Sequence, residues 1–420
     1  MIKNKIFKYF ITFLFGISCI FIGYENPLLI ETPKKYVKFI LKKFGVVENF
    51  FTNKQELQTV LDEKKPENNS KIILLNGNSF DLSYEKVINF DGRSAGIFVN
   101  TKKKDKLEFD IFLQEGINIK DNSVKELNVP VDIFLKKNGG VKSVIKIEGD
   151  AYALISNKSS VGCYYASIVN LNNAKKILST SCLPDEENID FNGLGGAYIE
   201  DQDHVLLSIG APEYFSQKIR SLAQINSSKF GKLIKIKKEA FKNEKISKED
   251  YKIYSLGHRN PQGLILTDNK IFSVEHGPQG GDELNFIEED NNYGWPIVSF
   301  GTKYNNGEGY KNISKTFTSP LYSFLPSIAP SSMNICPENL KKYYADNSCF
   351  LVLSLRAMSI FVVLVDKKNP KVMSIEQFKI DHRMRHFALD ENNKMFQKNN
   401  AFFISFDGFG LHKFKFDNFR

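Results

Sequence analysis

GHRNPQGLILTDNKIFSVEHGPQGGDELNFIEEDNNYGWP, residues Gly257–Pro296, gathers directional polar groups around glycine-rich turns and holds the only tryptophan of the chain, Trp295. In GHRNPQG, the guanidinium of Arg259 and the carboxamides of Asn260 and Gln262 stand between two glycines. A guanidinium fork binds a carboxylate bidentately, which an ammonium cannot do. The segment therefore predicts a binding site for an anionic or carbonyl-rich ligand.

The second half of this segment carries oxygen groups suited to a hard cation. In EHGPQGGDE, Gly277 and Pro278 form a turn whose backbone carbonyls are expected to point outward. The carboxylates of Asp282 and Glu283 follow at once. Because Ca²⁺ prefers several carboxylate and carbonyl oxygens, the turn predicts a calcium site.

Outward from this segment, short β-rich runs recur between Asn-Gly, Asp-Gly and Gly-Gly turn signals, among them KIILLNG, AGIFVNT, HVLLSIGA, CFLVLSL and AFFISFD. Helical periodicity is scarce after residue 90, apart from ENLKKYYAD. Evenly spaced short strands indicate a sandwich, barrel or propeller. We assign residues 86–420 to this all-β region, which is too long for one sandwich. Six units of about 50 residues fit a six-bladed β-propeller of four-stranded antiparallel blades.

The N-terminus predicts export. Residues 1–30 contain Lys3, Lys5 and Lys8, followed by an apolar run from Phe10 to Tyr24. We interpret this as an uncleaved signal anchor with its lysines in the cytoplasm. A cleaved signal peptide is the alternative. Residues 31–85 are expected to form a short juxtamembrane helix and a polar linker, which places the propeller in the periplasm.

Export changes the interpretation of the cysteines. Apart from Cys19 there are four, and an even number in an oxidising compartment favours two disulfides. The local pairings would join Cys163 to Cys182 and Cys336 to Cys349. Four buried free thiols are the alternative. No C-x-x-C occurs, which disfavours a thiol redox centre or a zinc ribbon.

The basic residues point away from nucleic acid. The net charge is +9, yet only seven of the 57 basic residues are arginine. Lysine without clustered arginine or stacking aromatics describes a solvated surface, so we predict no nucleic-acid partner. In such a chain arginine is expected where lysine will not serve. Four arginines lie in polar, loop-like settings, although a surface ion pair is the alternative for any one of them: Arg259, Arg356, Arg383 and Arg385.

These motifs carry a family resemblance. In order and spacing, GHRNPQG, EHGPQGGDE and NYGWP resemble the signature of the pyrroloquinoline-quinone-dependent glucose, aldose and sorbosone dehydrogenases, which are six-bladed propellers. Five further segments are similar to family strands or loops: GGAYIEDQDHVLLSIGAPE, FGKLIKI, PLYSFLPSIAPSS, SLRAMSIF and DHRMRHFALDENNKMF. The resemblance covers roughly residues 190–415 and does not extend to residues 31–140.

The resemblance implies a role for each matched position. Arg259 and Asn260 would face the quinone and a small sugar substrate, with Gln262 beside them. The carbonyls of Gly277 and Pro278 would hold the calcium that polarises the cofactor. Glu283 and the Tyr293 carbonyl would belong to a second, structural calcium. Three arginines would bind the carboxylates and quinone oxygens of the cofactor: Arg356, Arg383 and Arg385.

One departure from the family pattern concerns catalysis. The family's general base is a histidine in an H-x-G-[GS]-R-L pattern, and this chain reads FNGLGGAYI with Gly193 at the histidine position. A general base contributes typically 10²–10⁴-fold to the rate. His276 and His386 are the candidates for a relocated base. Two functions follow: a membrane-anchored aldose dehydrogenase with altered chemistry, or a catalytically silent propeller that binds a ligand or protein.

Overall fold

The computed structural model describes residues 72–420, except 101–106, 121–122, 214 and 311–315. The chain divides into two compact units, Met1–Thr59 and Val60–Arg420, and all described residues belong to the second. The predicted anchor and the first part of the predicted linker lie outside the described residues. Among the residues that are described, no helix is long and apolar enough to cross a membrane.

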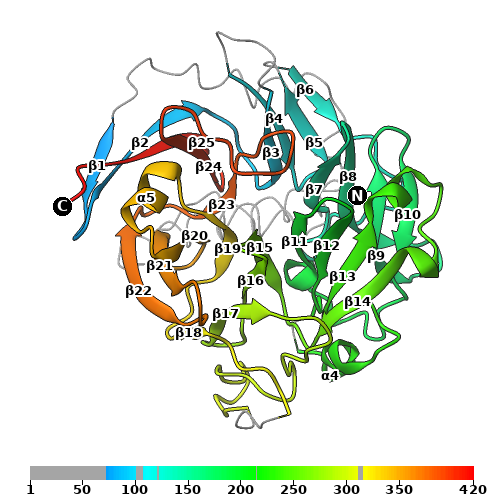
Figure 1. Ribbon diagram of the computed structural model, residues 1–420. Helices are drawn as coiled ribbons and strands as arrows, with labels where there is room; N and C mark the ends of the chain where they lie inside the picture. The colour runs from blue at the N-terminus through cyan, green and yellow to red at the C-terminus, as the bar shows by residue number, and fades with distance from the viewer. Residues whose placement is uncertain (1–71, 101–106, 121–122, 214, 311–315) are drawn as a thin grey trace, which may run out of the picture. The chain divides into compact units, whose positions relative to one another are not determined.

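Six antiparallel sheets make up the second unit (Figure 1). Five of them contain four strands that follow one another along the chain. These are β3 (Ser94–Asn100), β4 (Glu108–Leu113), β5 (Ile117–Lys120) and β6 (Ser123–Glu126); β7 (Val141–Ile147), β8 (Asp150–Lys158), β9 (Tyr164–Asn170) and β10 (Lys175–Ser179); β11 (Gly195–Glu200), β12 (His204–Ile209), β13 (Lys232–Lys237) and β14 (Tyr251–Leu256); β15 (Pro261–Thr267), β16 (Lys270–Glu275), β17 (Asp282–Ile287) and β18 (Tyr322–Phe324); β19 (Pro330–Ile335), β20 (Asn347–Ser354), β21 (Ser359–Asp366) and β22 (Val372–Lys379).

The sixth sheet closes the ring by joining both ends of the unit. Its strand order is β1 (Ile73–Asn76), β2 (Asp81–Ile88), β25 (Gly410–Asp417), β24 (Ala401–Phe406) and β23 (Met384–Phe387). β2 pairs with β25 in antiparallel register, with Asp81 opposite Asp417. The strands β3, β7, β11, β15, β19 and β23 contact one another in a closed circle. The predicted six-bladed propeller is confirmed, with a fifth strand in its closing blade.

The predicted domain boundary at residue 86 needs correction. Residue 86 lies inside β2, and β1 precedes it, so the propeller already includes Ile73–Asn76. β1 is mostly exposed and β2 finds its partner more than 300 residues later in the chain. Neither strand therefore leaves a strong local signal of its place in the propeller, and the polar sequence before them favoured a linker.

Helices are few and short in the part of the chain that the structure describes. The α-helices there are α4 (Gln217–Ser221) and α5 (Glu338–Tyr343), and α5 coincides with the predicted ENLKKYYAD segment. Single turns of 3-10 helix occur at η2 (Phe191–Leu194), η3 (Leu222–Gln224), η4 (Lys238–Lys242) and η5 (Lys248–Asp250). The hydrophobic core lies between neighbouring sheets, where β-branched and aromatic side chains of the middle strands pack together.

A β-bulge interrupts the first residues of every inner strand. In each case the innermost strand has one more residue than its partner before the ladder resumes. A bulge leaves its extra residue unpaired and re-aims that side chain. The residues concerned are Ala95, Lys142, one of Gly196 and Ala197, Gln262, Ser331, and one of Arg385 and His386.

Both predicted disulfides are present. Cys163 is bonded to Cys182 and Cys336 to Cys349, with Cα–Cα separations of 5.4 Å in each pair. The first bond joins the start of β9 to the segment after β10. The second joins the end of β19 to β20 inside a core cluster. The alternative of four free thiols is therefore wrong for this structure.

Candidate functional site

The predicted site residues gather on one face of the propeller. In a four-stranded antiparallel blade, the segment that enters the inner strand and the loop between the second and third strands open on the same side. Arg259 and Asn260 precede β15, and Arg383 and Arg385 stand at the start of β23. Loops between second and third strands supply the Gly277–Asp282 turn, Arg356 and Asp407.

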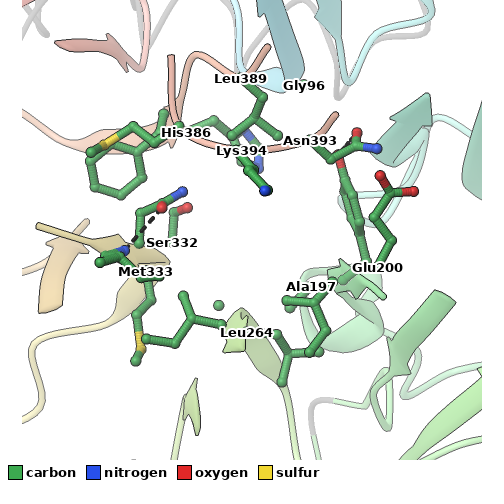
Figure 2. A pocket seen from close by; sticks show the side chains of 18 of the residues that line it. Gly96, Ala197, Glu200, Leu264, Ser332, Met333, His386, Leu389, Asn393 and Lys394 are labelled. Carbon is green, nitrogen blue, oxygen red and sulfur yellow. Dashed lines mark hydrogen bonds between the residues drawn. The ribbon is translucent and has the colours of Figure 1, made fainter. Parts of the chain in front are cut away.

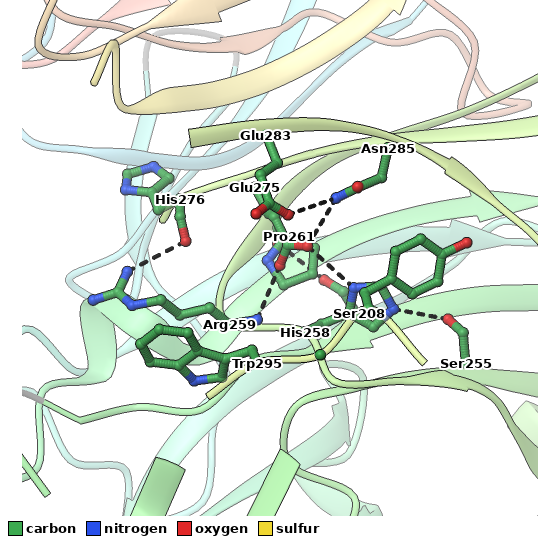
Figure 3. A network of polar contacts seen from close by, with 12 residues as sticks. Ser208, Ser255, His258, Arg259, Pro261, Glu275, His276, Glu283, Asn285 and Trp295 are labelled. Atoms are coloured by element: carbon green, nitrogen blue, oxygen red, sulfur yellow. Dashed lines mark hydrogen bonds and ion pairs between the residues drawn. The ribbon is translucent and has the colours of Figure 1, made fainter. Parts of the chain in front are cut away.

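Contacts with His276 and Trp295 hold the Arg259 side chain on this face. Its Nη1 donates to the carbonyl of His276 at 3.3 Å, and its guanidinium lies 5.3 Å from the centroid of the Trp295 ring (Figure 3). Its Nε is buried and has no hydrogen-bond partner among the described residues. A buried unpaired donor is costly. The Arg259 guanidinium is therefore set to bind an acceptor that a ligand would bring.

Asn260 and Gln262 brace two neighbouring inner strands. The Asn260 Oδ1 accepts from the backbone N–H of Gly195 at 3.0 Å and from Gln262 Nε2 at 2.8 Å. Gln262 Nε2 also donates to the Gly195 carbonyl at 3.2 Å. Asn260 is only 3% exposed. Its carboxamide oxygen is therefore occupied within the protein, and only the amide nitrogen is left to contact a ligand.

Arg385 forms the strongest ion pair of this face. Its Nε and Nη2 bind the two oxygens of Asp407 at 2.5 and 2.6 Å, and both side chains are largely buried. Arg383 is more exposed and reaches the same carboxylate at 3.4 Å. Arg356 is exposed, and within the described residues its side chain makes no hydrogen bond or ion pair. Arg385 and Arg383 thus share one carboxylate and Arg356 has no such partner among the described residues, which leaves positive charge for an anion.

The Gly277–Asp282 turn is held from inside. Asp282 accepts hydrogen bonds from the backbone N–H groups of Gly277 at 3.0 Å and Ala329 at 2.6 Å, and from the Ser327 hydroxyl at 3.2 Å. Among the described residues, nothing donates a hydrogen bond to the carbonyls of Gly277 and Pro278, although both residues are buried. Two carbonyls without a hydrogen-bond donor suit a hard cation. The Asp282 carboxylate instead shapes the turn.

A pair of carboxylates lies beneath the turn, with Glu275 buried and Glu283 half-buried. Glu275 and Glu283 stand opposite each other on β16 and β17 (Figure 3). Asn285 Nδ2 donates to both, at 3.0 and 3.2 Å, while Glu275 also accepts from the Arg259 backbone N–H at 2.9 Å. Burial and the charge of Glu275 raise the pKa of Glu283 well above its ordinary value. Such a pair favours a shared proton or a bound cation.

The other predicted metal ligand, Tyr293, lies beside this pair. Its ring stacks on His258 at 4.7 Å, its hydroxyl donates to the Phe286 carbonyl, and among the described residues its own carbonyl accepts no hydrogen bond. Over the described part of the chain, no three His, Cys, Asp or Glu side chains are grouped as metal ligands. A calcium here would therefore depend on backbone carbonyls together with Glu283.

Gly193 lies in η2, on the same face as Arg259. Asp190 caps this turn by accepting from the Asn192 backbone N–H, and it also accepts from Asn138 Nδ2 at 3.0 Å. A Cβ atom on Gly193 would lie 2.9 Å from the Ala211 carbonyl oxygen and 3.2 Å from Pro212 Cα. The backbone has therefore closed around the glycine at the position where the family pattern has histidine.

The two candidate replacement bases are weak. His276 Nε2 lies 2.7 Å from the Pro330 carbonyl, so it carries the proton and leaves Nδ1 as the acceptor. Burial, reinforced by the charge of Arg259, lowers the pKa of His276. Burial and Arg385 lower the pKa of His386 to about 3, and its Nδ1 lies 2.9 Å from the Ser94 hydroxyl. A low pKa opposes proton uptake by either imidazole.

A cavity of about 1090 Å³ runs along the axis of the inner strands. Figure 2 shows residues from several blades around it, including Gly96, Ala197, Leu264, Ser332 and His386. Residues of the β23–β24 connection, among them Lys394 and Asn393, also line it. Asn393 accepts from the Tyr198 hydroxyl at 3.0 Å and donates to the Lys146 carbonyl. These hydrogen bonds of Asn393 link three blades, those that contain β7, β11 and β23.

Sequence reasoning missed several residues of this face. The sequence patterns assigned no role to four of them: Glu275, Asp407, Lys142 and Asp190. A hairpin signal could have found Glu275, because Glu275 and Glu283 flank the GPQGGD turn and fall opposite each other. No such signal marks Lys142, which looks like a solvent-facing position of an alternating strand. The bulge in β7 directs the Lys142 side chain into the axial cavity, and the sequence does not reveal this bulge.

Comparison with known proteins gives a consistent result. The sequence profile of the glucose/sorbosone dehydrogenase family matches residues 168–401. Quinoprotein glucose dehydrogenase B of Acinetobacter calcoaceticus is 52% identical over 63 residues, which is 15% of this chain and 13% of that protein. The aldose sugar dehydrogenase YliI of Escherichia coli is 46% identical over 54 residues, 12% and 15% respectively. The matches span less than a third of these curated relatives.

Solved structures share the fold over a longer range. The soluble aldose sugar dehydrogenase of Escherichia coli, in its apo form, superposes with a TM-score of 0.63 at 19% identity, covering 80% of this chain and 99% of that chain. The PQQ-bound aldose sugar dehydrogenase of Streptomyces coelicolor gives 0.52 at 15% identity, covering 84% and 99%. At such identity the likeness establishes the propeller fold alone.

Proposed function

Because the chain belongs to the glucose/sorbosone dehydrogenase family, we propose that it is an oxidoreductase that oxidises an aldose-type sugar with pyrroloquinoline quinone (PQQ) as hydride acceptor. The observation that carries the proposal is the group of arginines on one face of the propeller. Arg259, Arg356, Arg383 and Arg385 share this face with the turn at Gly277 and Pro278. A tricarboxylate cofactor held by guanidiniums and a hard cation fits these donors.

Each of these residues would have its own role in binding the cofactor or in the reaction. Bound PQQ supplies a quinone that accepts the hydride from the sugar. Arg385 and Arg383, oriented by Asp407, neutralise carboxylates, and Arg356 adds an unpaired guanidinium. Arg259 offers its unpaired Nε to the reacting oxygens from the Trp295 side. Donors fixed before the ligand arrives stabilise developing charge without reorganisation.

Calcium is proposed at two places. The unpaired carbonyls of Gly277 and Pro278 would hold one ion at the cofactor. The Glu275–Glu283 pair and the Tyr293 carbonyl would hold a second, structural ion. The raised pKa of Glu283 supports the second site, since a cation would stabilise the second negative charge that the carboxylate pair resists.

The second candidate function is a catalytically silent propeller. It is favoured by Gly193, because the backbone is closed where the family's base would stand and both replacement histidines have lowered pKa values. In that case the same face would bind a ligand without turnover. Both candidate functions allow a quinone to bind. They differ in whether a sugar then reduces the bound quinone.

The deciding experiment is a titration of the purified full-length protein with PQQ and calcium. Trp295 is the only tryptophan and lies beneath Arg259, so quenching of its fluorescence reports binding at this face. Aldoses are then added and the cofactor spectrum is followed. Binding with reduction supports the dehydrogenase. Binding without reduction by any aldose supports the silent propeller. Failure to bind PQQ overturns the proposed cofactor.

Restoring a histidine at position 193 is expected to give only partial rescue. The new Cβ would press on the Ala211 carbonyl, so Gly193→His should lower the free energy of unfolding by about 1–3 kcal/mol. We expect aldose turnover to rise, yet by less than the roughly 10²–10⁴-fold that a well-placed base supplies. Turnover is followed through reduction of the bound cofactor, and stability by urea unfolding.

Gly193→Ala is the matched control for this experiment. It carries the same Cβ and no imidazole, so it should lose similar stability and gain no turnover. An alanine variant as stable as the parent would show that the backbone is not closed around Gly193. A folded histidine variant with unchanged turnover would count against position 193 as the site of the missing base.

We also propose that residues 1–30 anchor the protein in the inner membrane and leave the propeller in the periplasm. The support is the basic, then apolar N-terminal sequence and the two disulfides, which persist in oxidising compartments. Protease treatment of spheroplasts tests the placement. A propeller that is degraded only after the cells are lysed would contradict it.

A further inference from the structure

Lys142 occupies an unusual position at the mouth of the axial cavity, hereafter called the channel. It is the unpaired bulge residue of β7 and lines the axial cavity together with Gln262 and His386. Its Nζ donates to the Asn138 carbonyl at 3.1 Å, which is its only hydrogen bond among the described residues. No carboxylate within that part of the chain comes close enough to form an ion pair with it.

Two positive and two negative groups act on the charge of Lys142. Arg385 from β23 and Arg93, which leads into β3, both act on its charge, and His386 lies on the same side. Asp190 and Glu115 are the negative groups that act on it. Asp190 is engaged by Asn138 and the turn at Asn192, and Glu115 lies 4.0 Å from Arg93.

The three cations come from adjacent inner strands in the order β23, β3, β7. Lys142 and Arg385 both lie in the bulges that open their strands, and between them β3 offers only the small side chain of Ala95. The inner strands therefore carry Lys142 and Arg385 on either side of β3, and Arg93 leads into β3 itself.

We propose that Lys142, Arg93 and Arg385 form a binding site for the carboxylates of an anionic ligand at the channel mouth. The proposal rests on the proposed function in naming PQQ as that ligand, and Lys142 and Arg93 are then cofactor-binding residues in addition to those of the family motifs. A partly buried ammonium with a single carbonyl acceptor is costly, and a ligand carboxylate would supply the missing counter-charge.

This arrangement couples ligand binding to a proton. Burial, then the charges of Arg385 and Arg93, lower the pKa of Lys142 to about 7. Without ligand, Lys142 therefore loses its proton as the pH rises through about 7, far below the ordinary value of a lysine. A carboxylate beside it raises the pKa again. At pH 8 binding should therefore take up most of a proton, and at pH 6 far less.

The test measures proton uptake and the pKa of Lys142 directly, and not activity. Calorimetric titration of the full-length protein with PQQ, at fixed calcium and in buffers of different ionisation enthalpy, gives the protons bound per ligand. We expect the affinity to fall up to tenfold per pH unit above pH 7. Lys142→Arg should keep the affinity and lose this pH dependence. Lys142→Met should lose both, with affinity at pH 6.5 reduced 10- to 100-fold.

Lys146→Met is the matched control on the same strand. Lys146 pairs with Asp110 at 2.8 Å, away from the channel mouth, and its replacement should leave proton uptake unchanged. Reductive ¹³C-methylation followed by NMR gives the pKa of Lys142 in the parent protein, with its signal assigned by its absence from Lys142→Arg. A pKa near 10 in the free protein, or one that does not move when PQQ binds, overturns the proposal.

A second probe separates this proposal from the proposed function. If PQQ does not bind, 1,3,5-benzenetricarboxylate is titrated in its place while the Lys142 signal is followed. A rise in the pKa of Lys142 then supports a carboxylate site even though the dehydrogenase assignment has failed. If neither ligand raises that pKa, the carboxylate site itself is overturned.

Discussion

Replacing Arg385 by methionine is expected to weaken PQQ binding at least about 30-fold. Arg385 holds both oxygens of Asp407 and has Nη1 left for a ligand. Truncating one member of a buried, hydrogen-bonded charge pair costs about 2–5 kcal/mol of binding free energy, and each 1.4 kcal/mol is tenfold in affinity. The variant should also lose about 3 kcal/mol of folding free energy, because Asp407 keeps only the more exposed Arg383 as a charge partner.

Arg383→Met is the matched control for this effect. Arg383 is 53% exposed and lies 3.4 Å from the same carboxylate, so its loss should cost less than about 1 kcal/mol of stability. Fluorescence of Trp295 gives the affinity, and urea unfolding gives the stability. Equal losses for the two arginines would contradict the view that Asp407 presents Arg385 in particular. The Asp407→Asn variant should resemble Arg385→Met in binding.

Replacing Phe80 by alanine is expected to remove about 3–5 kcal/mol of folding free energy. Phe80 is fully buried between β1 and β2. Its ring stacks on Phe378 of the neighbouring blade at 5.4 Å and meets Phe416 of β25 edge-on at 5.1 Å. The side chain therefore joins the closing blade to the blade before it. Equilibrium unfolding in urea measures the loss.

Phe419→Ala is the control, because Phe419 contacts Phe80 at 5.8 Å but is 37% exposed. Phe419→Ala should lower the free energy of unfolding by less than half as much as Phe80→Ala does. The pair also tests the corrected domain boundary. If residues 72–85 were a linker, both substitutions would have small effects, and the unfolding midpoint of Phe80→Ala would lie close to that of the parent.

The fold could be predicted largely because its motifs are local. The turns in GHRNPQG and EHGPQGGDE are set by neighbouring residues, and the disulfides close short loops of 19 and 13 residues. The start of the propeller could not be predicted in this way. β2 pairs with β25, so the evidence for β2 lies at the other end of the chain.

The candidate site was predictable in part for a similar reason. The arginines stood out because the chain uses lysine almost everywhere else. The orientation of these arginines could not be predicted, because it depends on Asp407. Asp407 lies in a separate loop and contacts Arg385 only in the folded chain. The role of Asp282 was also hidden. Its oxygens bind Gly277, Ser327 and Ala329, and a pattern of carboxylates after a turn cannot distinguish a metal ligand from a brace.

The bulges of the inner strands bear on how this scaffold can change. Each bulge residue is left out of the ladder, so its replacement removes no pairing between strands. A position such as Lys142 can therefore exchange size and charge at little cost to the pairing of the blade that carries it. The propeller holds six such places around one axis, and relatives that differ there can acquire new ligands while the architecture stays the same.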